Sequence, residues 1–210
     1  METNSCAGLP GRFERALAAI DAVNAQDPNT VICAGEVRPK ELAHAQRASH
    51  WLATLDARAS EALRLAVRAH HLRRWALPRA KYPLGRVGYH AWRRELQNRH
   101  ARECGELLSA AGYDAALIER VSELIRKRGL GRDPQAQVYE DVLCLVFIEL
   151  QLESFAAAHD AEKIVEILAR TLPKMSERAI GLAAKLPASA PTAELIRRAV
   201  QRAADEAAKP

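Results

Sequence analysis

The spacing of apolar residues along this chain is that of α-helices from one end almost to the other. Residues that favour helix, namely alanine, leucine, arginine and glutamate, dominate the composition, and long runs of β-branched residues are absent. Hydrophobic residues make up 49% of the 210 positions, which is enough for a sizeable core. We therefore predict an all-α fold, built as a single-domain helical bundle.

Turn residues divide this pattern into segments. Helices are expected at 12–25, 39–55, 60–77, 89–110, 115–128, 133–155, 163–172, 176–186 and 192–207. Residues 31–33 are expected to form a short apolar link, and the prolines and glycines in 77–88 predict a loop. The domain prediction is a helical domain at 1–186, a linker at 187–191 and a polar C-terminal helix at 192–210.

The sequence argues against a secretory signal and against a membrane-spanning helix. The chain opens with Met1-Glu2-Thr3-Asn4, without the basic and apolar regions of a secretory signal. Its longest strongly apolar run, 142–148, is too short to span a bilayer. The four cysteines (Cys6, Cys33, Cys104 and Cys144) show no CxxC pairing. We expect a cytoplasmic protein with no membrane partner.

Several predicted helices place an ionisable side chain on or beside an apolar face. At 100° per residue, these side chains are His50, His70, His71, His100, Glu140 and Asp141. A buried carboxylate is costly unless it is paired or bound to a metal, and a buried histidine needs a hydrogen-bond partner. One divalent metal ion, such as Mn, Fe, Co, Ni or Zn, would satisfy them together.

A simpler interpretation applies to each of these residues alone, because a single histidine on an apolar face is more often a hydrogen-bonded core residue than a ligand. The coincidence on four helices favours a shared site. The remaining histidines, His44, His90 and His159, show no such coincidence and are expected at the surface or at loop edges. Cys104, four residues after His100, is a poorer candidate nucleophile, because an apolar row disfavours a thiolate.

Positive charge is concentrated in residues 62–94, which hold nine lysines and arginines and no aspartate or glutamate, although the whole chain carries only +5. Basic side chains alternate there with Trp75, Tyr82, Tyr89 and Trp92. The candidates for binding a phosphate are Arg73, Arg79, Lys81 and Arg86. The alternative is that the tryptophans are core anchors and the arginines cap helix ends.

Four phrases resemble a family of bacterial and fungal proteins known as domain of unknown function 4202. They are HWLATLDARASEALRLAVRAHHLRRWALPR, KYPLGRVGYHAWRREL, GLGRDPQAQVYEDVLCLVFIELQLESF and EKIVEILARTLPKMS, which cover most of residues 50–176. The matching positions include His71, Arg73, Arg79, Trp92, Arg93, His100, Glu140, Asp141 and Ser176. This resemblance implies no activity.

The order of these elements is also similar to that of the HD-type metal phosphohydrolases, which are all-helical. The resemblance implies that His50 is the first metal ligand, that LRLAVRAHHL is the helix ending in a His-Asp pair, that His100 is a further ligand and that Asp141 is the distal aspartate. The pair reads His70-His71 in this chain, so a carboxylate is replaced by a neutral ligand.

Two functional hypotheses follow. The first is an HD-like phosphohydrolase that acts on a nucleotide or another phosphoester. Its metal would be held by His50, by His70 or His71, by Asp141 and optionally by His100, with Glu140 and Asp141 as catalytic groups. The second is a catalytically inert helical module that binds RNA or a phosphorylated ligand through the basic loop, where its phosphate contacts would make binding sensitive to salt.

Overall fold

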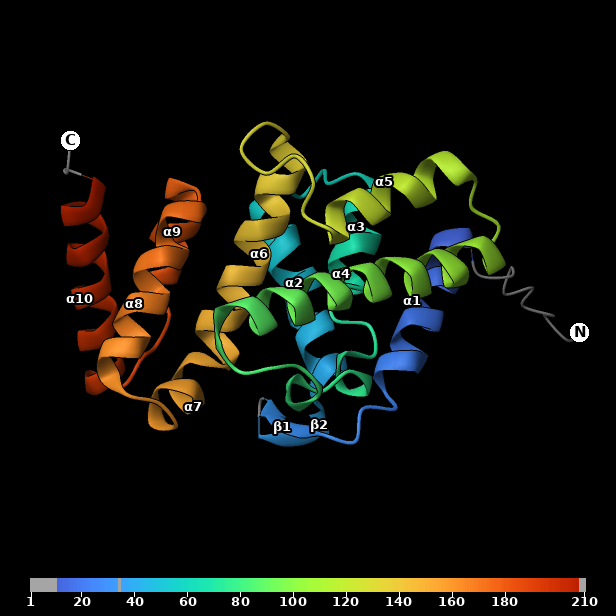
Figure 1. Ribbon diagram of the computed structural model, residues 1–210. Coiled ribbons are helices and arrows are strands. Elements are labelled where there is room, and N and C mark those ends of the chain that lie inside the picture. The colour runs from blue at the N-terminus through green and yellow to red at the C-terminus, as the bar shows by residue number, and fades with distance from the viewer. Residues whose placement is uncertain (1–10, 34, 208–210) are drawn as a thin grey trace, which may run out of the picture. The chain divides into compact units, whose positions relative to one another are not determined.

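Residues 11–33 and 35–207 are described by a computed structural model, and helices make up most of them (Figure 1). Within this part of the chain, the strands form one short antiparallel hairpin. The predicted all-α fold is therefore confirmed. None of the helices in the described residues is long and apolar enough to cross a bilayer.

The chain divides into two units, which are described separately. The first unit comprises residues up to 45 together with residues 60–126. The second comprises residues 46–59 and residues from 127 onward. Helix α2 (Lys40–Leu55) therefore gives its N-terminal turns to the first unit and its remainder to the second.

Four helices form the body of the first unit. They are α1 (Arg12–Asn24), α3 (Glu61–Arg68), α4 (Gly85–Ala110) and α5 (Ala115–Ile125). Helices α3 and α4 both pack against α5, and α1 contacts α3 and α4. Side chains cap two of these helices, because Ser60 Oγ accepts a hydrogen bond from Leu63 N (3.2 Å) and Asp114 Oδ1 accepts one from Leu117 N (2.8 Å).

A hairpin between α1 and α2 replaces the apolar link predicted at residues 31–33. Strand β1 (Thr30–Cys33) pairs with β2 (Glu36–Pro39), and Ile32 lies opposite Val37. The β-branched side chains of β1 favour an extended backbone, and Gly35 takes the positive φ of +82° that the turn requires. The prediction failed here because three apolar residues are too few to show a strand period.

The segment after α3 turns sooner than predicted. Helix α3 ends at Arg68, whereas the sequence predicted a helix running to the residue before Pro78. Arg73, with a φ of 50°, lies in the left-handed region, which a helix cannot continue through. Two short 3-10 turns follow, η1 (Arg74–Ala76) and η2 (Arg79–Lys81), and α4 begins at Gly85. The predicted loop at 77–88 is thus partly helical.

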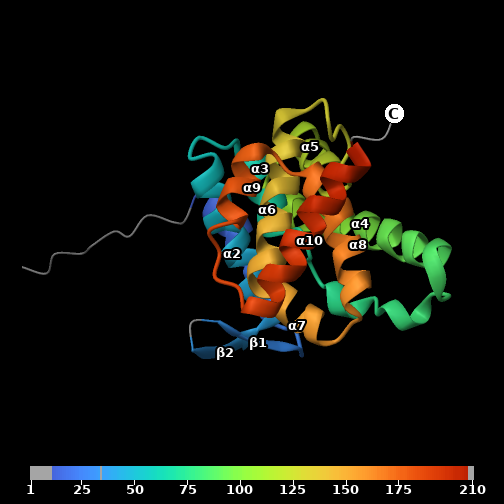
Figure 2. The ribbon, with the colours of Figure 1, turned by 90° about the vertical axis from the view of Figure 1, so that its left-hand side faces the viewer.

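The second unit contains the remainder of α2 and the C-terminal helices. These are α6 (Pro134–Leu150), α7 (Leu152–Ala157), α8 (Ala161–Thr171), η3 (Leu172–Lys174), α9 (Glu177–Ala183) and α10 (Ala190–Ala207). As the sequence predicted, Asp133 caps α6, accepting a hydrogen bond from Gln135 N at 2.9 Å. The helix predicted to continue to residue 155 breaks at Gln151. Helix α10 packs along α8, as Figure 1 and Figure 2 both show.

Candidate metal centre

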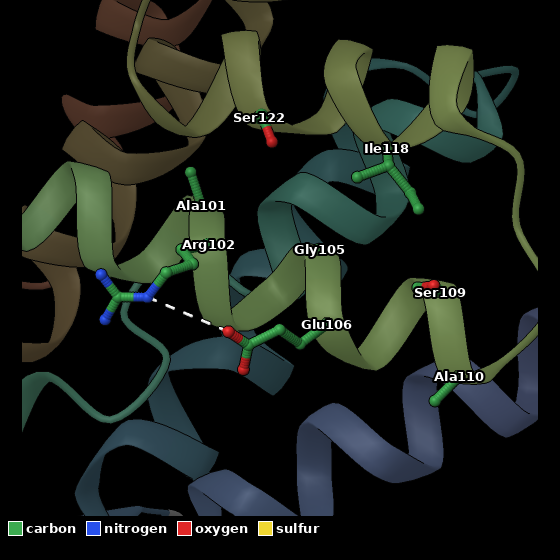
Figure 3. A pocket seen from close by; sticks show the side chains of 8 residues that line it. All are labelled: Ala101, Arg102, Gly105, Glu106, Ser109, Ala110, Ile118 and Ser122. Carbon is green, nitrogen blue, oxygen red and sulfur yellow. Dashed lines mark ion pairs between the residues drawn. The ribbon is translucent and has the colours of Figure 1, made fainter.

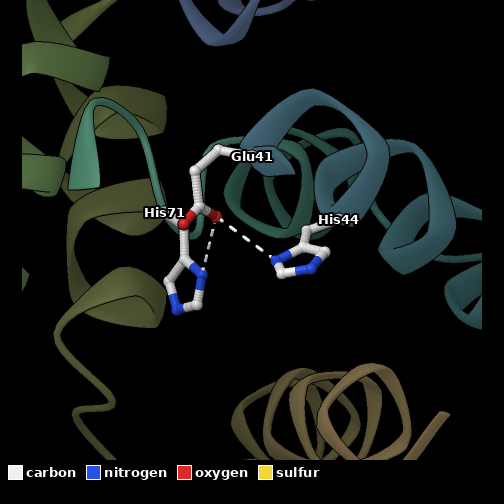
Figure 4. Close-up of side chains that lie close together, drawn as sticks. All are labelled: Glu41, His44 and His71. Atoms are coloured by element: carbon white, nitrogen blue, oxygen red, sulfur yellow. Dashed lines mark hydrogen bonds and ion pairs between the residues drawn. The ribbon is translucent and has the colours of Figure 1, made fainter. Parts of the chain in front are cut away.

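A glutamate and two histidines converge inside the first unit. Glu41 and His44 lie on the N-terminal turns of α2, three residues apart and therefore on one face, and His71 comes three residues after the end of α3. One potential ligand atom from each of the three lies within 4.8 Å of those of the other two. Figure 4 shows the Glu41 carboxylate between the two imidazole rings. This is the metal-ligand group that the described residues form.

The position of Glu41 is set by the start of α2. Asp27 Oδ2 accepts a hydrogen bond from Glu41 N (3.0 Å), while Asp27 Oδ1 accepts bonds from the backbone and side chain of Asn29 (2.9 and 2.8 Å). This arrangement caps the helix and fixes the backbone from which the carboxylate projects. The Glu41 side chain is only 5% exposed, and the nearby helix N-terminus favours its negative charge.

The Glu41 carboxylate is ionised in this environment. Its Oε2 lies 3.0 Å from His71 Nδ1 and 3.5 Å from His44 Nδ1. Burial alone raises the pKa of the carboxyl group, but His71 and His44 outweigh burial, so that the pKa lies well below its usual range. Because a carboxylate can only accept, the hydrogen on His71 is assigned to Nδ1, which leaves Nε2 with a lone pair.

Two further histidines lie beside this group. The His70 ring is 4.2 Å from the His71 ring and the His100 ring is 6.1 Å from it, measured between centroids. His70 Nδ1 donates to Val67 O (2.9 Å) and His100 Nδ1 donates to Leu72 O (2.7 Å). Backbone carbonyls orient metal-binding histidines in this way, with Nε2 left free to accept. The structure therefore brings His70, His71 and His100 together, as the sequence predicted.

His70, His71 and His100 are neutral at pH 7. Burial lowers the pKa of the His70 imidazole to about 4 and that of His100 to about 3. Burial and the neighbouring His70 lower the pKa of His71 well below its usual value. Neutral imidazoles and an ionised carboxylate are the protonation states in which these groups bind metals.

Two residues of this group were missed by the sequence reasoning. His44 was expected at the surface, and that prediction was wrong, because its side chain is fully buried. Its Nε2 has no partner among the described residues, and the 3.5 Å approach of Nδ1 to Glu41 is at the limit of a hydrogen bond. Glu41 was not considered. The signal that would have found both is the Glu-x-x-His spacing, which places two ligands on one helix face.

The other predicted ligands and catalytic groups belong to the second unit. His50 is exposed. Glu140 pairs with Lys127. Asp141 accepts hydrogen bonds from Ser176 N (2.8 Å), Ser176 Oγ (2.6 Å) and Gln137 Nε2 (3.0 Å), which fix the start of α9. These donors account for the buried carboxylates of Glu140 and Asp141 without a metal.

The four residues predicted to bind phosphate differ in their burial and in their hydrogen bonds. Arg79 donates to the carbonyl oxygens of Tyr82 (2.9 Å) and Pro83 (2.8 Å), so its guanidinium group holds the loop together. Arg73 and Lys81 are exposed. Arg86 is exposed as well, with its Nε 3.4 Å from His90 Nε2.

A surface hollow of about 700 Å³ lies between α4 and α5 (Figure 3). None of the residues that line it belongs to the histidine cluster. Gly105 faces Ile118 across it, and a Cβ atom at Gly105 would lie 3.2 Å from Ile118 Cγ2. Its charged residues, Arg102 and Glu106, pair with each other at 3.9 Å.

The fold and this cluster define an all-α protein with buried histidines around a carboxylate. The model of the family described as a domain of unknown function (DUF4202) matches residues 14–196, so the chain belongs to this family. The resemblance of the sequence to domain of unknown function 4202 is thereby confirmed. No curated protein and no solved structure matches the chain significantly.

Proposed function

We propose that Glu41, His44 and His71 bind a divalent metal ion and that the protein is a metal-dependent phosphohydrolase acting on a nucleotide or another phosphoester. The observation that carries this proposal is the group itself, in which Glu41 and His44 are buried, His71 is half-buried and the three ligand atoms lie within 4.8 Å of one another. Two histidines and one carboxylate are the protein ligands of many catalytic zinc sites, which keep one position open for water.

Charge and protonation support the ligand assignment. The ionised Glu41 supplies the negative charge that a divalent cation needs, and the lowered pKa of His71 keeps its ring neutral. The proton that His71 Nδ1 shares with Glu41 would be displaced if that nitrogen became the ligand, so metal binding would release a proton and weaken in acid. Nε2 of His44 already lacks a partner in the described structure.

The bound ion would supply Lewis-acid chemistry, lowering the pKa of a water molecule and polarising a phosphoryl oxygen. Around it, His70 is held by Val67 O so that its Nε2 remains a proton acceptor. The water-poor surroundings of His44 and His100 strengthen every charge interaction in the site. These residues would orient and polarise the phosphoryl group, while the carboxylate of Glu41 would balance the positive charge of the ion.

The resemblance to the HD-type phosphohydrolases takes a modified form in this proposal. The sequence pair His70-His71 lacks the aspartate of the His-Asp pair, and Glu41 from α2 places a carboxylate 3.0 Å from His71 instead. His44, rather than His50, joins His71 and Glu41 in the proposed ligand group. The proposed ligand set thus keeps both a histidine and a carboxylate beside His71 while drawing them from α2.

Elemental analysis of protein purified without chelators tests the proposal. We expect near-stoichiometric Mn, Fe, Co, Ni or Zn, and metal affinity lower by at least about tenfold in Glu41→Gln and His44→Ala. His50→Ala is the matched control, because His50 is an exposed histidine of the same helix, and it should retain the metal. Wild-type protein that stays metal-free after reconstitution would contradict the proposal. A metal-loaded protein that releases no phosphate from a phosphoester panel would contradict the hydrolase assignment.

The second candidate is a catalytically inert module that binds RNA or a phosphorylated ligand. The observation that favours it is the Glu41–His71 hydrogen bond of 3.0 Å, which satisfies both groups without a metal. Exposed Lys81 and Arg86 add positive charge to the surface. Binding that weakens steeply with salt, without turnover in the presence of any metal, would favour this candidate.

A further inference from the structure

Among the described residues, Arg74 has no acceptor for its guanidinium group, unlike Arg68 and Arg99, which are also half-buried in the first unit. It is the first residue of η1, and its backbone N donates to His71 O at 2.9 Å. The left-handed backbone of Arg73 turns the chain immediately before it. Arg74 therefore follows the proposed metal ligand by one turn, on a segment whose backbone is fixed.

The aromatic ring of Trp92 supports this guanidinium group. Arg74 Cζ lies 4.9 Å from the centroid of the Trp92 ring, a distance at which the ring attracts the cation. The ring itself is buried, and Trp92 Nε1 donates to Leu77 O at 2.9 Å. This contact with a fixed ring restrains the guanidinium group without using its N–H donors.

Within residues 11–33 and 35–207, no hydrogen bond or ion pair links the Arg74 guanidinium to an acceptor. The contrast is with Arg68, which reaches both oxygens of Asp21 at 2.5 and 2.6 Å. Arg99 likewise pairs with Glu103 at 2.6 Å. A half-buried cation with unused donors is costly unless an anion completes it.

The charges near Arg74 favour a dianion. Burial lowers the pKa of Arg74, Glu41 opposes that effect without forming an ion pair, and the positive charge of Arg93 adds to it. Arg93 carries a second guanidinium group on the same helix as Trp92. Two arginines near one another match the charge of a phosphate monoester, which is about −1.5 to −2 at pH 7.

We infer that Arg74, with Arg93 as the second cation, binds the phosphoryl oxygens of a phosphate monoester beside the Glu41, His44 and His71 group. The inference rests on the proposed function for the reaction at that phosphoryl group, and it names the substrate class. It assigns phosphate binding to a residue other than Arg73, Arg79, Lys81 and Arg86. A planar fork with free donors can bind two phosphoryl oxygens at once.

The test is calorimetric titration of the full-length protein with inorganic phosphate, before and after removal of metal by chelation. Arg74→Gln removes the charge and should weaken phosphate binding by about tenfold or more, whereas Arg74→Lys keeps the charge, loses the fork and should fall between that variant and wild type. The control is Arg94→Gln, an exposed arginine of the same basic region to which no binding role is assigned, and it should bind phosphate within about twofold of wild type. Circular dichroism and thermal unfolding verify that each variant is folded.

The outcomes separate this inference from the proposed function. Phosphate binding by metal-free protein that depends on Arg74 supports the inference even if no metal ever binds, in which case the metalloenzyme proposal fails alone. Metal binding with phosphate affinity unchanged in Arg74→Gln overturns the inference and leaves the metal proposal standing. Absence of phosphate binding by wild-type protein in both metal states also overturns the inference.

Discussion

Buried ionisable side chains occur in both units, but their hydrogen bonding differs. In the second unit, the Asp141 carboxylate receives bonds from the backbone and hydroxyl of Ser176 and from Gln137, and Glu140 pairs with Lys127. In the first unit, His100 Nε2 and His44 Nε2 are buried without a partner among the described residues. Both units thus bury ionisable side chains, but these carboxylates of the second unit have hydrogen-bond partners, whereas the two imidazole nitrogens of the first unit have none within the described part of the chain.

This difference distinguishes a structural role from a candidate site. A carboxylate that caps a helix uses its capacity inside the protein, and nothing further has to bind. An imidazole whose Nδ1 is tied to a carbonyl and whose Nε2 is unused presents a lone pair to whatever enters. From sequence alone the two kinds of residue are identical, since both are polar groups on apolar helix faces.

Replacing Asp141 by alanine should cause the largest change in stability, because it leaves the donors of Ser176 and Gln137 without their acceptor. We expect the free energy of unfolding to fall by about 3 kcal/mol in chemical denaturation. Asp160→Ala in the same unit is the control, since it removes an exposed helix cap and should cost about 1 kcal/mol. If Asp141→Ala instead lost metal while its stability stayed at the wild-type value, the comparison between the two units would break, and Asp141 would be a ligand.

Acid should destabilise the protein through the histidines of the first unit. The unfolded chain binds a proton at His100 below about pH 6.5, whereas the folded protein does so only near pH 3, so stability falls as pH drops through this window. At pH 5 the loss from His100 is about 2 kcal/mol relative to pH 7. Glu41 affects stability at lower pH, because its lowered pKa gives a stabilisation that is lost only when the pH falls below 4.5, the pKa of the unfolded state.

Urea unfolding at pH 7 and pH 5 measures this effect. His100→Gln keeps a donor for Leu72 O without a titrating ring, so the difference in stability between the two pH values should shrink. His50→Gln changes an exposed histidine and should leave the difference as it is in wild type. A pH dependence that is equal in wild type and His100→Gln would show that His100 is not kept neutral by burial.

The helical pattern was predictable from sequence because periodicity and caps are local. Ser60, Asp114 and Asp133 begin helices through contacts two or three residues away. The boundaries that failed depend on single backbone conformations, such as the left-handed Arg73 that follows the early end of α3. A local pattern does not reveal which of several arginines will adopt a positive φ.

The candidate site was half predictable for a related reason. His70, His71 and His100 fall on apolar faces, and the structure places their rings together. Glu41 was missed because its burial depends on the cap from Asp27, fourteen residues earlier, and on His71, thirty residues later. Asp141 was assigned to the metal because its true donors, Ser176 above all, are distant in sequence.

The smallest expected effect concerns the turn that precedes Arg74. Glycine adopts a φ near 50° without the steric cost that arginine bears there, but it also has more freedom in the unfolded chain, so Arg73→Gly should raise stability by no more than about 1 kcal/mol. The turn and the position of Arg74 should be kept, and phosphate titration should match wild type. Arg73→Ala is the matched control, because it removes the same side chain while retaining the backbone strain. If both variants lost phosphate affinity as strongly as Arg74→Gln, the side chain of Arg73 would be the phosphate ligand, as the sequence first suggested.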